Sequence, residues 1–215
     1  MTHGFDKDYW EQHWEQAHRN GPGSMGGGVA NPYLARETSC LAPGMALDAG
    51  CGGGAEAIWL ASRGWQVTAA DISTSALARA AENAVTSGVS DRIAWVEADL
   101  SVWEPGAQFD LVTTHYAHPA ISQLAFYERI ARWVAPGGTL LIVGHLHTSE
   151  PTDHDHGHGD QPPAEATATV ASITNALDDT VWEIVTAEEH LRTLAGHGDR
   201  SVPLHDVVVR ATRRS

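Results

Sequence analysis

Histidines follow two apolar runs of this sequence at positions where a parallel sheet would bring them together. His115 and His118 come after one run, and His145 and His147 come after the next. Because the carboxyl ends of parallel strands share one rim, we expect these imidazoles to lie near one another. Histidine exchanges a proton close to neutral pH, so this rim can supply a general base. His205 is expected nearby, at the start of a reversed last strand.

Three aspartates, Asp48, Asp71 and Asp99, end other apolar runs and face the same rim. A glycine-rich turn follows the first of them, and a helix and a second strand follow the turn. Glycines let a backbone approach a ligand where a Cβ would collide, and an acid after the second strand can bind both ribose hydroxyls. The unit is typical of nucleotide binding. Its parts are strand Met45–Ala49, turn Gly50–Gly54, helix Ala55–Arg63 and strand Gln66–Ala70.

The glycine spacing alone leaves the nucleotide open. Gly50-x-Gly52-x-x-Ala55 also fits a dinucleotide fingerprint, so a nicotinamide or flavin enzyme is one alternative. Asp48 argues against it, because a carboxylate beside the first glycine repels a pyrophosphate and attracts an ammonium group. S-adenosylmethionine carries an ammonium group and no phosphate, so it is the expected cofactor.

The run LDAGCGGG followed by Asp71 resembles motifs I and II of the class I S-adenosylmethionine-dependent methyltransferases, from about Leu41 to the C-terminus. The APGG turn before the LLIV strand is a further resemblance. In that family the acid at Asp99 contacts the adenine amino group and the side chain at Leu100 packs on the ring. The resemblance implies these cofactor-binding residues: Trp14, Asp48, Ala49, Gly50, Cys51, Gly52, Gly54, Asp71, Ile72, Ala98, Asp99, Leu100 and His115.

The same resemblance suggests the catalytic residues and the acceptor class. Residues after the fourth strand border the transferred methyl in similar enzymes, so His118 is the first candidate base and His115 the second. A base with an ordinary histidine pKa predicts activity that falls below about pH 6.5. THYAHP stands where amino-group methylators carry Asn-Pro-Pro-aromatic, which favours a small-molecule acceptor: a thiol, metalloid, phenol or amine.

The order of elements predicts an α/β fold, a Rossmann-like doubly wound sheet of seven strands with the last strand antiparallel and helices on both faces. Only residues 188–201 separate the last two strands, so they can pair directly. The remaining expected strands are Ile93–Ala98, Phe109–Thr114, Thr139–Gly144, Val181–Ala187 and Val202–Ala211. The remaining expected helices are Phe5–Arg19, Pro32–Thr38, Ala76–Thr86, Gln123–Val134 and Ala164–Leu177.

Residues 1–40 are expected to form a helical extension of the main domain, residues 41–215. Tyr9, Trp10, His13 and Trp14 make an aromatic stripe that either packs on the domain or closes over the cofactor. Such aromatic segments resemble those of the thiopurine and tellurite-resistance methyltransferases. The glycine-rich stretch 20–28 favours a lid.

Composition limits the partners and the location. The formal net charge is −14, which repels nucleic acid, and no run approaches the ~20 apolar residues of a membrane span. The polar N-terminus does not resemble a signal peptide, and Cys40 and Cys51 do not make a disulfide framework. We therefore expect a cytoplasmic protein that binds neither nucleic acid nor membrane.

A histidine-rich stretch, EPTDHDHGHGDQPP at 150–163, could bind a divalent metal through imidazole nitrogens. This gives a second hypothesis, a metal-binding or regulatory protein that has kept the fold and lost turnover. The intact acidic and glycine motifs oppose it, and the alternative for the histidine-rich stretch is a loop that holds no ion in use. The possible ligands are His145, His147, His154, His156 and His158.

Overall fold

A single mixed sheet forms the centre of the molecule in a computed structural model that describes residues 4–19, 28–146, 168–195 and 201–215. Its seven strands run in the order β3-β2-β1-β4-β5-β7-β6, with β7 antiparallel to both of its neighbours and the other pairs parallel. The predicted fold class is confirmed. The strands are β1 Met45–Ala49, β2 Gln66–Asp71, β3 Ile93–Glu97, β4 Phe109–His115, β5 Val134–His145, β6 Trp182–Ala195 and β7 Ser201–Arg213.

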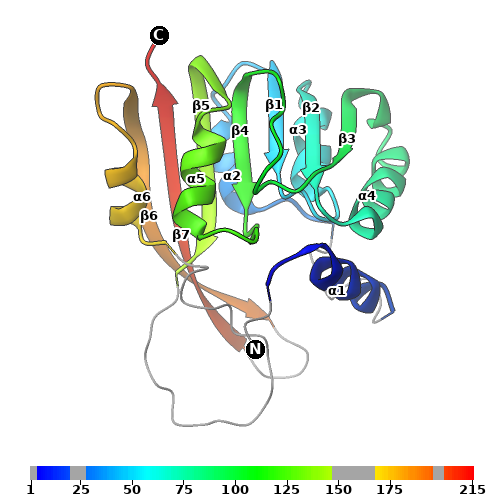
Figure 1. The fold of residues 1–215 in the computed structure, drawn as a ribbon. Helices are drawn as coiled ribbons and strands as arrows, with labels where there is room; N and C mark the ends of the chain where they lie inside the picture. The colour runs from blue at the N-terminus through cyan, green and yellow to red at the C-terminus, as the bar shows by residue number, and fades with distance from the viewer. Residues whose placement is uncertain (1–3, 20–27, 147–167, 196–200) are drawn as a thin grey trace, which may run out of the picture.

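Helices cover both faces of the sheet, and one further helix lies across the carboxyl ends of the strands (Figure 1). On one face, Phe126 and Ile130 of α5 and Ile173 of α6 pack over β4, β5 and β7. On the other, Leu34 of α2, Leu60 of α3 and Leu77 of α4 form a second core. The bounds are α1 Lys7–Arg19, α2 Pro32–Thr38, α3 Ala55–Ser62, α4 Thr74–Thr86, α5 Gln123–Ala131 and α6 Val170–Ala176, with a 3₁₀ turn η1 at Ser90–Arg92.

Side-chain caps set where several helices begin, and one of them corrects a predicted bound. Asp6 Oδ1 accepts a hydrogen bond from Tyr9 N, so α1 begins at Lys7 and not at Phe5. Thr169 caps α6 through Ser172 N, so the described helix begins at Val170, and the predicted start at Ala164 lies outside the described residues. α5 also ends earlier than predicted, at Ala131, because β5 already begins at Val134.

The APGG segment is a bulge within β5 and not a turn before it. Phe109 pairs with Val134, but Leu111 pairs with Thr139, so four residues of β5 have no register partner on β4. Gly137 takes φ +78° there, a conformation that glycine adopts without strain.

The last two strands are much longer than predicted. β6 continues to Ala195 and β7 begins at Ser201, because the two pair with each other beyond the end of β5. Figure 1 shows this two-stranded ribbon extending past the sheet on the same side as α1. The sequence did not predict a strand over Glu188, Glu189 and His190, because a ribbon outside the core does not need alternating apolar residues.

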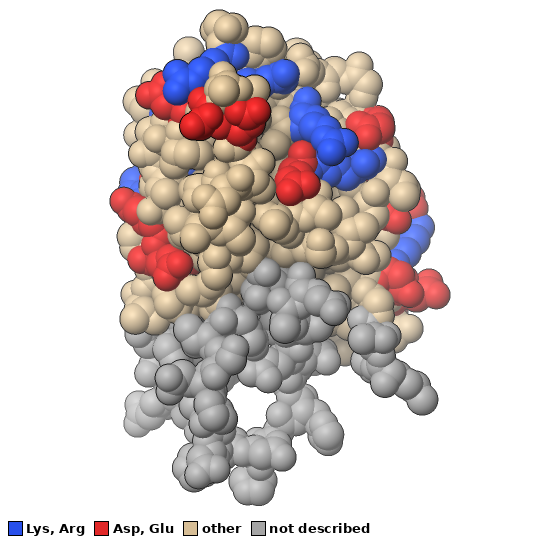
Figure 2. Space-filling view, turned by 60° about the vertical axis from the view of Figure 1, so that its left-hand side comes forward, with Lys and Arg blue, Asp and Glu red and all other residues tan. Residues whose placement is uncertain are grey.

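Charged side chains of both signs lie beside one another on the face that Figure 2 shows, with uncharged surface between the groups. Several make ion pairs between elements, such as Arg36 with Glu188 at 2.9 Å and Arg129 with Glu104 at 2.9 Å. Within the described residues, no helix is long and apolar enough to cross a membrane.

Candidate active site

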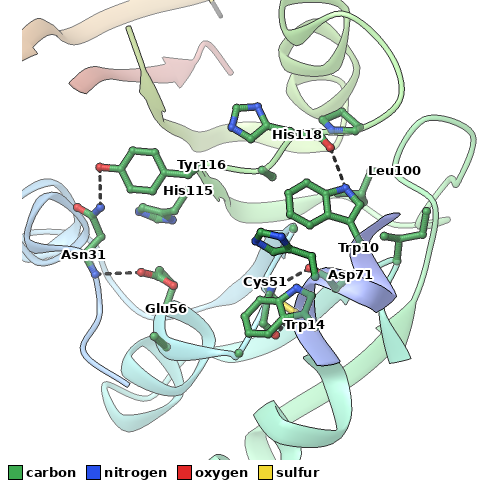
Figure 3. A pocket seen from close by; sticks show the side chains of 18 of the residues that line it. Trp10, Trp14, Asn31, Cys51, Glu56, Asp71, Leu100, His115, Tyr116 and His118 are labelled. Carbon is green, nitrogen blue, oxygen red and sulfur yellow. Dashed lines mark hydrogen bonds between the residues drawn. The ribbon is translucent and has the colours of Figure 1, made fainter. Parts of the chain in front are cut away.

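A cavity of about 890 Å³ opens at the carboxyl ends of β1, β2 and β4, beneath α1. Its volume lies in the range of small-molecule sites. Figure 3 shows Trp10 and Trp14 of α1 on one side and Asn31, Glu56 and Tyr116 on the other. Of the predicted cofactor-binding residues, the following line it: Trp14, Gly50, Cys51, Gly52, Asp71, Ile72, Ala98, Asp99, Leu100 and His115.

The glycine turn is held against the acid that ends β2. Asp71 Oδ2 accepts a hydrogen bond from Gly52 N at 2.8 Å, and Oδ1 accepts one from Ser73 N at 3.0 Å. Burial raises the pKa of Asp71, and these backbone donors oppose that shift. Gly50, Gly52 and Gly54 all have positive φ, which explains the glycines at these positions. The carboxylate is fixed at the cavity wall with lone pairs left for further donors.

Two carboxylates make the β1 end of the cavity acidic. Asp48 is 1% exposed, and its Oδ2 has no hydrogen-bond partner in the described part of the chain. Burial raises its pKa well above the usual value, and the charges of Glu56 and Asp71 add to that shift. Glu56 lines the cavity itself and accepts a hydrogen bond from Asn31 N at 2.9 Å. This end would stabilise a cationic ligand group and repel a phosphate.

Helix α1 forms one side of the cavity, where its residues Trp10 and Trp14 lie. Trp14 is 8% exposed, and a Cβ added to Gly52 would lie 2.7 Å from its ring. Trp10 donates a hydrogen bond from Nε1 to the carbonyl of His118 at 3.2 Å. The carboxylate of Glu11 accepts hydrogen bonds from Thr74 N at 2.6 Å and Ser75 N at 3.2 Å at the start of α4. Lys7 pairs with Glu97 at the end of β3.

Three of the predicted histidines, His115, His118 and His145, line the opposite end of the cavity, whereas His205 is not among the lining residues. The rings of His118 and His145 stack with centroids 6.5 Å apart, and Phe5 stacks on His118 at 5.6 Å. Burial lowers the pKa of His118 to about 4, with the neighbouring His145 adding to the shift and Gln123 opposing it. Burial also lowers the pKa of His115. Both are therefore neutral at pH 7, and a base role for His118 or His115 stays a prediction.

Three predicted cofactor residues lie behind the cavity wall and not on it. Asp48 is buried beneath the turn, and Ala49 packs in the core. Gly54 directly precedes α3, and a Cβ added there would lie 2.8 Å from Ala80 and from Trp95, so packing explains the glycine. Of the possible metal ligands, His147, His154, His156 and His158 lie outside the described residues. Within the described residues, no group of three or more His, Cys, Asp or Glu side chains could hold a metal ion.

Sequence reasoning missed Asn31, Glu56 and Tyr116. Asn31 Nδ2 donates to the Tyr116 hydroxyl at 3.2 Å, which links the acidic end of the cavity to the histidine end. Tyr116 has φ +55°, an uncommon conformation for a bulky side chain. No spacing rule brings these residues together, because they come from different segments. Glu56, an acid in the first turn of α3, was the one signal in the sequence that could have pointed to these residues.

A protein-family model for a methyltransferase domain matches residues 46–138. The chain is 30% identical over 191 residues to thiocyanate methyltransferase 1 of Brassica oleracea, covering 86% of this chain and 78% of that one. The chain belongs to the class I S-adenosylmethionine-dependent methyltransferases. A probable thiol methyltransferase 2 of Arabidopsis thaliana is 30% identical over 140 residues, covering 62% of this chain and 60% of its own.

A solved structure supports the same family. A methyltransferase from Geobacter sulfurreducens in complex with S-adenosylhomocysteine has a TM-score of 0.51 and 26% identity, over 58% of this chain and 53% of that one. The methyltransferase is thus an enzyme that uses S-adenosylmethionine. The alternatives of a nicotinamide oxidoreductase and of a protein without turnover are not retained.

The residues at the cavity suit this cofactor. Asp71 would accept from the ribose hydroxyls, Leu100 and Ala98 would form an apolar wall for the adenine, and Glu56 with Asp48 would balance the ammonium group. No lysine or arginine lies among the described residues that line the cavity. When bound, S-adenosylmethionine supplies a methyl group already activated by its sulfonium. The protein then has to orient the acceptor and exclude water.

Proposed function

We propose that this methyltransferase transfers a methyl group to the sulfur of a small thiol or of thiocyanate. One observation carries the proposal: the cavity continues from the cofactor residues to a second end lined by Phe5, Trp10, Tyr116, His118 and His145. That end is aromatic, and the lowered pKa keeps His118 neutral at pH 7. Soft sulfur makes favourable contacts with aromatic rings. The plant relatives named for thiocyanate and thiol methylation support the same class.

Two further points belong to this proposal. The extension 1–40 is proposed to act as a lid on the domain 41–215, supported by Trp14 above Gly52 and Glu11 at the start of α4. A cytoplasmic enzyme that does not act on nucleic acid is also proposed, supported by the net charge of −14.

The test is the release of S-adenosylhomocysteine with a panel of acceptors. Thiocyanate, an aliphatic thiol and benzenethiol would be compared with phenol, an aliphatic amine and tellurite, each corrected for the reaction without protein. We expect kcat/KM for the best sulfur acceptor to exceed that for phenol or the amine at least tenfold. A faster oxygen, nitrogen or tellurium acceptor would reject the sulfur assignment.

A further inference from the structure

We infer that His145 is the general base for acceptors that carry a proton, and that Asp206 and Tyr116 are the residues that position it. The inference rests on the proposed function, because it concerns the acceptor end of the same cavity. Two of the three residues, His145 and Tyr116, line that cavity, and Asp206 lies behind them on β7.

A buried carboxylate faces His145 from the neighbouring strand. Asp206 is 0% exposed and pairs in register with His145 across β5 and β7. Its Oδ1 lies 3.7 Å from His145 Nδ1, which is ion-pair distance once the imidazole is protonated. A carboxylate at this nitrogen favours the tautomer with hydrogen on Nδ1, which leaves Nε2 to accept a proton. It also stabilises the imidazolium that forms.

Tyr116 fixes the other side of this arrangement. Its ring stacks on His145 with centroids 4.1 Å apart and planes 18° apart. Its hydroxyl donates to Asp206 Oδ1 at 3.0 Å and accepts from Asn31 Nδ2 at 3.2 Å. The positive φ of Tyr116 is a strained conformation, and such outliers concentrate at functional sites. The ring therefore holds the imidazole plane while the hydroxyl holds the carboxylate.

His118 lacks these features. No carboxylate in the described residues pairs with it, and its buried Nδ1 has no hydrogen-bond partner there. Its ring lies between Phe5 and His145 as an apolar contact. The groups that face His145 are thus Asp206 from β7 and Tyr116 and His118 from the segment after β4. Only Asp206 among them brings a carboxylate.

The step balances without any further reactant. The acceptor S–H bond breaks and its proton goes to His145 Nε2. The sulfur electron pair forms the new S–CH₃ bond, and the bond between the methyl carbon and the sulfonium breaks toward the cofactor sulfur. The products are the methyl thioether, S-adenosylhomocysteine and a proton that His145 releases to solvent. Thiocyanate carries no proton at neutral pH, so this base does nothing for it.

That difference gives the experiment. His145→Gln, Asp206→Asn and Tyr116→Phe would be assayed with an aliphatic thiol and with thiocyanate, with His190→Gln as the matched control outside the cavity. We expect His145→Gln to lower kcat/KM for the thiol at least tenfold more than for thiocyanate. Asp206→Asn and Tyr116→Phe should lower the ratio of kcat/KM for the thiol to kcat/KM for thiocyanate to a lesser extent. His190→Gln should leave that ratio unchanged.

A readout without turnover completes the test. Side-chain ¹⁵N spectra of the wild type should show the neutral His145 ring with hydrogen on Nδ1, and Asp206→Asn should reduce that preference. Equal losses for both acceptors, or hydrogen on Nε2 in the wild type, would overturn the inference while the sulfur methyltransferase stands. Turnover of neither acceptor by the wild type would reject the proposed function and this inference with it.

Discussion

At the scale of single residues, each oxygen of Asp71 holds one backbone N–H and keeps lone pairs for a ligand. The same carboxylate therefore shapes the glycine turn and offers acceptors to the ribose. A side chain with two structural hydrogen bonds does not have to reorganise when a ligand arrives. This preorganisation saves the conformational cost of binding.

Asp71→Asn should weaken S-adenosylhomocysteine binding at least tenfold, because one charged acceptor becomes an amide donor. A charge-assisted hydrogen bond contributes roughly 1.5–3 kcal/mol. Calorimetry measures the change, with Asp91→Asn on the distant 3₁₀ turn as a control for lost charge. Equal affinity in wild type and Asp71→Asn would remove Asp71 from the cofactor site.

His118 should also make the protein less stable in mild acid. Its pKa is about 4 in the folded protein and near 6.5 when unfolded, so the unfolded chain binds the extra proton first. Its contribution is complete above pH 6.5 and is lost as the pH falls toward 4, by up to about 3 kcal/mol. Denaturant unfolding measures this effect. Between pH 6.5 and pH 4, the free energy of unfolding should fall less for His118→Phe than for the wild type, when each is expressed relative to its value at pH 8. An equal fall in the free energy of unfolding for both proteins would contradict the lowered pKa of His118.

The residues of this site were predictable where the backbone alone determined them. The glycine turn and Asp71 follow from consecutive sequence, and they meet as predicted. The register of β5 on β7 places Asp206 opposite His145, and Tyr116 reaches the same carboxylate from the end of β4, which no local pattern encodes. The lowered pKa of His118 depends on burial and on the neighbouring His145, which tertiary packing and not local sequence determines.

At the scale of elements, one acid of α1 binds the start of another helix. Glu11 accepts hydrogen bonds from the backbone of Thr74 and Ser75, the first residues of α4, where the helix dipole favours a negative charge. Burial opposes ionisation, but hydrogen bonds from the side chains and the backbone of Thr74 and Ser75 lower the pKa of Glu11 to about 2. The attachment is complete above pH 4.5 and weakens as the pH falls toward 2.

Glu11→Gln should therefore loosen α1 at neutral pH. We expect S-adenosylhomocysteine affinity to fall several-fold while the melting temperature stays within a few degrees of the wild type. Glu15→Gln, on the same helix, is the control for a lost charge. A large drop in melting temperature would show that α1 belongs to the core, and deletion of residues 1–28 would then unfold the protein.

Element types were predictable to a greater extent than element ends. Apolar runs located all seven strands, because each strand packs apolar side chains into one or both of the two cores. The ends of β6 and β7 depend on pairing outside the core, and the start of α6 depends on the Thr169 cap. These strand and helix ends are set by hydrogen bonds, which the pattern of apolar residues does not predict.

At the scale of the whole molecule, the charge distribution sets what can approach it. Acidic residues outnumber basic ones by 27 to 13, and basic side chains on the face in Figure 2 lie close to acidic ones. We expect no retention of duplex DNA or of structured RNA in a mobility-shift assay at low salt, where basic proteins bind with Kd of roughly 10⁻⁴–10⁻⁶ M or tighter. A retarded band that disappears with added salt would contradict the small-molecule assignment.

The position of β7 affects how this protein is made. β6 is synthesised before β7, yet β7 is the strand that joins it to β5. While the ribosome still holds β7, the emerging chain exposes two open strand edges, those of β5 and β6. Such edges pair readily with other chains. The nascent protein therefore passes through an aggregation-prone stage that ends only when β7 inserts between β5 and β6.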